Sequence, residues 1–150
     1  MTAELSNNCS TITIESNFFN ANNISNQLTL VHSGTTYTVE IDAENVDPVV
    51  VDANTLDLEE LPEGVYLITL KTVNQDSTVT TEQLCLTSMC VLHCDMIALY
   101  TDTANLEKIL AYEALKVASD CITCSCTVMQ RLYDKATDTH NATKCNCQSA

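Results

Sequence analysis

The sequence predicts an α+β protein, in which an antiparallel β-sandwich of about five to seven strands is followed by a bundle of three helices. Apolar residues alternate with polar ones from residue 10 to about residue 86, and turn-forming residues interrupt this alternation roughly every ten residues. After residue 88 the apolar spacing changes to the helical period. We therefore expect a sandwich domain at residues 1–86 and a cysteine-rich helical domain with a short C-terminal tail at residues 87–150.

The alternating half divides into short segments that are bounded by turn residues. The stretch STITIES places Ile12 and Ile14 on one face of a strand, and QLTLVHSGTTYTVEI predicts a hairpin that turns at Ser33 and Gly34. DPVVVD predicts a short strand behind a proline, and NQDS joins the strands expected in LPEGVYLITLKTV and TVTTEQLCL. The apolar positions that share one face of the predicted hairpin are Leu28, Leu30, Tyr37, Val39 and Ile41.

The stretch LPEGVYLITL combines a turn with the start of a strand. Pro62 restricts the turn, Gly64 can adopt a positive φ, and Tyr66 and Ile68 lie on the same side of the strand. The stretch resembles the strand entry of bacterial and phage immunoglobulin-like or fibronectin-like modules, in which a Leu-Pro-x-Gly turn precedes a strand that carries Tyr. The resemblance implies an immunoglobulin-like sandwich, and we expect the turn itself to be structural.

Three segments of the C-terminal half have helical spacing. Residues 88–100 are apolar on nearly all sides, and TDTANLEKILAYEALKVASD begins with capping candidates at Asp102 and Thr103. The third helix is expected to start near Ser119 or Asp120 and to continue through CITCSCTVMQRLYDKATDT. The apolar pattern consists of Leu106, Ile109, Leu110 and Val117 in the second helix, and of Ile122, Met129, Leu132, Tyr133 and Ala136 in the third.

Most of the nine cysteines lie in the helical half, which indicates a common cause. Cys121 and Cys124 lie three residues apart on one face of the expected third helix, and Cys145 and Cys147 follow in the tail. A CxxC pair followed after about twenty residues by a CxC pair approximates a four-thiolate zinc site. The four cysteines are therefore the predicted ligands of a structural zinc ion.

Alternatives to this zinc site remain open. Cys90, His93 and Cys94 have the spacing i, i+3 and i+4, and they would meet Cys126 or the CITC thiols if the first and third helices were neighbours. A disulfide between the tail and a helix, or buried thiols without a ligand, would also explain the cysteines. Because the N-terminus lacks the features of a secretory signal, we expect the thiols to stay reduced.

The sequence offers little material for catalysis. CITC has the spacing of redox enzymes, but the strands all precede the helices, so no βαβ unit surrounds it. His32, His93 and His140 lack a nucleophile or carboxylate at diagnostic spacing, and glycines only at positions 34 and 64 exclude a phosphate-binding loop. No DxDxDG loop supports a calcium site among the scattered carboxylates. We expect a protein that is not an enzyme, with structural zinc as its candidate cofactor.

The charge of the chain restricts its partners. Six basic and twenty acidic residues give a net charge of -14, which repels phosphates and anionic lipids. The longest apolar run, residues 84–100, contains His93 and Asp95 and is short for a bilayer span. We therefore expect no direct contact with nucleic acid and no membrane anchor.

One resemblance is carried by the Asn-rich alternating half, the stretches LPEGVYLITL, YEALKVASDCITCSC and RLYDK, and the closing CxC. In these features the chain is similar to short structural proteins of tailed bacteriophages. The likeness covers about residues 60–147. It implies a virion component of the neck, tail, head-tail connector or capsid surface, assembled in the host cytoplasm as a homo-oligomer with other virion proteins. Two alternatives are a small zinc-binding or thiol-containing regulatory protein and a receptor-binding or carbohydrate-binding module, the last disfavoured by the absence of Trp.

Overall fold

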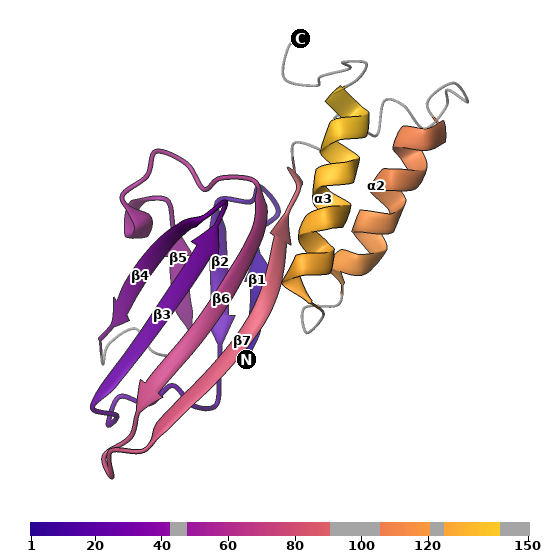
Figure 1. Ribbon diagram of the computed structural model, residues 1–150. Helices are drawn as coiled ribbons and strands as arrows, with labels where there is room; N and C mark the ends of the chain where they lie inside the picture. The colour runs from indigo at the N-terminus through magenta and orange to yellow at the C-terminus, as the bar shows by residue number, and fades with distance from the viewer. Residues whose placement is uncertain (43–47, 91–105, 121–124, 142–150) are drawn as a thin grey trace.

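The computed structural model describes residues 1–42, 48–90, 106–120 and 125–141. Within these residues, seven strands form two antiparallel sheets that pack face to face (Figure 1). The first sheet has the order β1 (Thr2–Leu5), β2 (Thr11–Glu15) and β5 (Val49–Asp52). The second has the order β4 (Thr35–Ile41), β3 (Ser25–His32), β6 (Gly64–Val73) and β7 (Val79–Ser88). A short 3-10 helix, η1 (Asn54–Leu56), follows β5. The seven strands of the described residues reach the upper end of the predicted number.

The core between the sheets is built from alternate strand positions. Ile12 and Ile14 of β2 face Leu28 and Leu30 of β3, and all four side chains are fully buried. The predicted hairpin turns at Ser33 and Gly34, whose positive φ angles are those of the two central residues of a type I′ turn. The period of two therefore identifies the buried face of each of these strands.

Strand β1 is missing from the sequence prediction. It pairs with β2 in the register Ala3 with Ile14 and Leu5 with Ile12, and Ala3 is buried. A segment of four residues with only two alternate apolar positions carries too weak a pattern to be recognised, because its position is set by the neighbouring strand rather than by its own sequence.

The prediction of a three-helix bundle is wrong. Within the described residues, two α-helices, α2 (Leu106–Ser119) and α3 (Cys126–Asn141), form a hairpin that packs beside β6 and β7 (Figure 1). Val65 and Cys85 on the outer face of the second sheet supply the apolar surface that a third helix would provide in a bundle. The helix expected at residues 88–100 falls, from residue 91 onward, outside the described residues.

The third predicted helix begins later than expected. Ser119 ends α2, its hydroxyl donates to the Lys116 carbonyl oxygen, and Asp120 lies in the following turn. Helix α3 starts at Cys126 and buries Met129 and Ala136 as predicted, while residues 121–124 lie outside the described residues. Strand β7 also continues to Ser88, beyond the predicted domain boundary at residue 86.

Helix α2 turns a different face toward the protein than its leucine and valine spacing indicates. Ala111, Tyr112 and Leu115 are buried, whereas Leu110 and Val117 leave 60% and 72% of their surface exposed. The helix is apolar on two sides, so its spacing alone does not select the side that packs against α3 and the sheet. The expected core position of Leu110 and Val117 is therefore corrected to a position on the surface.

Candidate interaction surface

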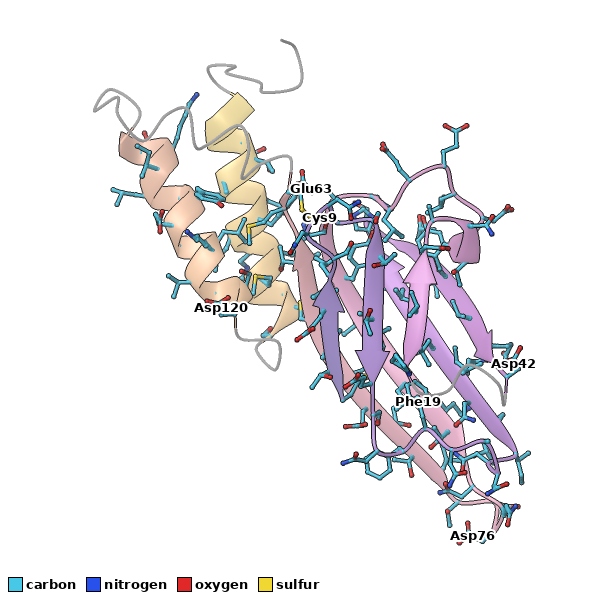
Figure 2. The ribbon with its side chains drawn as sticks, turned by 180° about the vertical axis from the view of Figure 1, so that it is seen from behind. Cys9, Phe19, Asp42, Glu63, Asp76 and Asp120 are labelled. Carbon is cyan, nitrogen blue, oxygen red and sulfur yellow. A yellow bond between two sulfur atoms is a disulfide. The ribbon has the colours of Figure 1, made fainter. Side chains whose placement is uncertain are left out.

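The turn that precedes β6 lies at the end of the sandwich next to the helices. Figure 2 shows Glu63 in that position, with Asp76 at the opposite end of the sandwich. The Nε2 atom of His32 lies 2.7 Å from the carbonyl oxygen of Glu63, and because a carbonyl only accepts, the ring donates this hydrogen bond. The His32 and Tyr66 ring centroids are 4.9 Å apart.

The same turn has the structural role expected of the LPEGVY stretch. The Tyr66 hydroxyl donates a hydrogen bond to the Pro62 carbonyl oxygen, which is the tyrosine corner of immunoglobulin-like sandwiches. Gly64 has a φ of 130°, and a Cβ atom there would lie 2.7 Å from His32 Nε2. The backbone of β6 therefore approaches the His32 ring so closely that only glycine fits.

Two tyrosines of the helical hairpin complete this junction around Glu63. Burial raises the pKa of Tyr133 in α3, and the charge of Glu63 and a hydrogen bond with its carboxylate raise it further. Burial, followed by the charges of Glu113 and Glu63, raises the pKa of Tyr112 in α2 to about 12. Both phenols therefore stay neutral at physiological pH, and the Tyr133 hydroxyl serves as a donor to Glu63.

Two disulfides cross-link the same end of the molecule. Cys85 of β7 is joined to Cys126 of α3, with Cα atoms 5.4 Å apart, and Cys9 of the β1–β2 turn is joined to Cys90 after β7. The expectation that the cysteines stay reduced is therefore wrong for these four. Cys9 and Cys85 are the two cysteines that precede the helical half. Each of them bonds to one of the clustered cysteines.

The predicted zinc site falls largely outside the described residues. Its members there are Cys121, Cys124, Cys145 and Cys147, together with the alternates His93 and Cys94. The other alternates, Cys90 and Cys126, have their sulfurs in disulfides, which are not the thiolates that zinc binds. Among the described residues, no group of three or more His, Cys, Asp or Glu side chains is placed to hold a metal ion.

The side of α2 opposite its buried face carries a row of exposed apolar residues. Leu110, Ala114 and Val117 recur at i, i+4 and i+7, and we call this row the α2 stripe. Leu110 and Ala114 also line a groove of about 440 Å³ between the helices, with Leu132 and Lys135 of α3 on its other side. Exposed apolar surface of this kind, bordered by charged residues, is typical of a protein contact surface.

Comparison of the chain with protein-family models, curated proteins and solved structures finds no match. In the part of the chain that the structure describes, no helix has the length and apolar character needed to cross a membrane. The fold and the surface together define the class of this protein. It is a two-sheet antiparallel β-sandwich to which a disulfide-linked helical hairpin adds an exposed apolar stripe.

Proposed function

We propose that this chain is a non-enzymatic structural protein that forms contacts between subunits of an assembly. The observation that carries the proposal is the exposure of the α2 stripe. Burying a fully exposed valine or leucine side chain contributes about 1.5–3 kcal/mol. Leu110 and Val117 are partly covered already, so a neighbour that buries the rest of both gains about 2–4 kcal/mol from them, and its other contacts supply the remainder of the ~8 kcal/mol of a micromolar complex.

The support beneath the stripe favours this role. The Cys85–Cys126 disulfide ties α3 to the sheet, and the Glu63–Tyr133 hydrogen bond joins α3 to the sandwich at a second point. Helix α2 packs on α3 through Ala111, Tyr112 and Leu115, among other residues. A stripe held in one position loses little conformational entropy when it binds, which raises the affinity for a given contact area.

The assembly we propose is the virion of a tailed bacteriophage, at the neck, tail, connector or capsid surface. The sequence resemblance supports this assignment, and the partners are copies of the chain and other virion proteins. A net charge of -14 limits unspecific association before assembly. Disulfides persist in oxidising surroundings, so the cross-linked form corresponds to the particle after its release from the host cytoplasm.

The proposal is tested by mixing the purified chain with the products of the genes next to its own and recording complexes by native mass spectrometry. Val117→Glu changes the α2 stripe, and Thr81→Glu adds the same charge at an exposed position of β7. We expect oligomers or mixed complexes that Val117→Glu weakens at least about tenfold and that Thr81→Glu leaves unchanged. A chain that stays monomeric with every neighbour, or equal effects of both substitutions, would contradict the proposal.

The same mass spectra, together with circular dichroism, test the zinc-binding alternative. A structural zinc site predicts about one metal ion per chain in the intact mass and a loss of helix when a chelator is added. A metal-free mass with unchanged helix content after chelation would remove this alternative. It would leave the proposed assembly function in place, because that function does not depend on metal.

A further inference from the structure

Among the described residues nothing pairs with the outer edge of β4, the outermost strand of the second sheet. We propose that this edge pairs with β4 of a second copy of the chain, so that two four-stranded sheets become continuous across a twofold axis. The inference rests on the proposed function, since it names one of the contacts between subunits. Figure 1 shows β4 on the side of the sandwich away from the helices, so the contact leaves the α2 stripe accessible.

The edge of β4 is regular over its whole length. From Thr35 to Ile41 each residue pairs with β3 without a bulge, and among the described residues no backbone hydrogen bond reaches the outer side of the strand. The helix η1 lies near β4, but its Leu56 is buried in the sandwich core. Figure 2 places Asp42, which follows β4, at the side of the molecule remote from the helices.

The turn of the hairpin determines which backbone groups of β4 face outward. A two-residue type I′ turn makes its closing pair, His32 and Thr35, a hydrogen-bonded pair. Hydrogen-bonded and non-hydrogen-bonded pairs alternate along an antiparallel ladder, so every second residue directs its N–H and C=O away from β3. The residues with these outward groups are Thr36, Thr38 and Glu40.

These outward groups match those of a second copy in one antiparallel register. When Thr38 lies opposite Thr38 of the second copy, Thr36 lies opposite Glu40 of that copy, and the reverse pair forms by symmetry. Each pair exchanges both backbone hydrogen bonds. On the inner face, Tyr37 lies opposite Val39 of the second copy, an aromatic and β-branched pair of the kind that stabilises sheets. No like charges are opposed.

The other long edge of the same sheet is protected, and β4 is not. Glu82 of β7 lies opposite Leu70 on the inner side of the sheet, where its carboxylate is 2.9 Å from the amino group of Met1. An inward-pointing charge on an edge strand opposes pairing with another chain. Strand β4 lacks proline, lysine and inward-pointing charge, and its charged residue, Glu40, is on the outer face with a hydrogen bond from Gln27. The edge of β4 is therefore the one suited to strand addition.

A matched pair of lysine substitutions tests the register. Thr36→Lys places a positive charge opposite Glu40 of the second copy, twice in the dimer, and Thr38→Lys places two lysines opposite each other. Both variants change the net charge of the chain by the same amount, and both side chains are exposed. We expect Thr36→Lys, which forms two lysine–glutamate pairs, to tighten the dimer by about 2- to 30-fold, and Thr38→Lys, which forms one lysine pair, to weaken it by about 1.4- to 5-fold.

The dimer is measured by sedimentation of the full chain at concentrations between about 1 µM and 1 mM. This is the range of dissociation constants expected when a small interface joins two copies of equal charge. Opposite shifts of the two variants support the β4 register. A wild-type chain that stays monomeric at 1 mM, or variants that shift in the same direction, would overturn it. If oligomers respond to Val117→Glu but not to the β4 variants, the β4 inference fails and the proposed function stands. The reverse pattern supports β4 and rejects the α2 stripe.

Discussion

Replacing Gly64 by alanine tests the junction between the sandwich and the helices. At a φ of 130°, a residue with a Cβ atom is strained by about 1–3 kcal/mol. The added atom would lie 2.7 Å from His32 Nε2, so the imidazole must move. Its hydrogen bond to the Glu63 carbonyl oxygen, which contributes about 0.5–1.5 kcal/mol, is then lost. We expect Gly64→Ala to lower the free energy of unfolding by about 2–4 kcal/mol.

Gly34→Ala is the matched control for this substitution. Gly34 has a φ of 80°, and a Cβ atom there meets no atom within 4 Å, so its cost is limited to about 1–2 kcal/mol of backbone strain. Urea unfolding followed by circular dichroism compares the two variants. The loss for Gly64→Ala should be about twice that for Gly34→Ala, and the excess should shrink when His32 is also replaced by alanine. Equal losses in the two variants would refute the close approach of His32 to β6.

Two further predictions concern the same end of the molecule. Cys126→Ala removes a cross-link between residues 41 positions apart and should lower the free energy of unfolding by about 4 kcal/mol in urea; an unchanged midpoint would show that this bond does not form. Stability should also fall as the pH rises above 10, because burial raises the pKa of Tyr66, Tyr112 and Tyr133. In the unfolded chain the tyrosines lose their protons near pH 10, whereas in the folded chain they keep them to higher pH. The stabilisation is therefore complete below pH 10 and is lost as the pH rises toward the pKa values of the folded state. The free energy of unfolding falls by up to about 1.4 kcal/mol per pH unit for each tyrosine. Tyr133→Phe should make this decline less steep. If the variant and the wild-type chain lost stability identically with pH, the burial of the Tyr133 hydroxyl would be contradicted.

The strands could be predicted because each has one buried face. Ile12 and Ile14, or Leu28 and Leu30, are buried and alternate with residues that are only partly buried, and a shift of one position would move all four to the outer faces of the sheets. The Ser33–Gly34 turn fixes the register of the hairpin independently. Strand β1 escaped prediction because its pairing with β2, and not its own short sequence, determines its structure.

The packing of the helices could not be predicted from their spacing, because α2 has two apolar sides. A signal was present elsewhere, in the strand that receives the helices. Residues 65–68 of β6 are continuously apolar, and a strand with this pattern is covered on both faces. Val65 indeed contacts the helical hairpin while Tyr66 faces the sandwich core. The apolar run of β6 is therefore a signal of a second layer that the prediction of a three-helix bundle did not use, and α2 and α3 supply that layer instead of forming a bundle.

The chemistry of the cysteines was beyond the sequence for a different reason. CxxC and CxC spacings describe ligands that are close along the chain, whereas Cys9 and Cys90 are separated by 81 positions and Cys85 and Cys126 by 41. Only the fold brings such residues together, because the pairing of cysteines depends on topology. The sandwich and the hairpin had to be placed before either bond could be assigned.

The α2 stripe is tested most directly by hydroxyl-radical footprinting, which reports the solvent exposure of individual side chains in the free and assembled chain. Leu110 and Val117 are the probes, and Val50 of β5, which is half exposed, is the internal control. If a neighbouring subunit covers the stripe, oxidation of Leu110 and Val117 falls severalfold on assembly while that of Val50 stays the same. Equal oxidation of Leu110 and Val117 in the free and assembled chain would contradict the assignment of α2 as the contact surface.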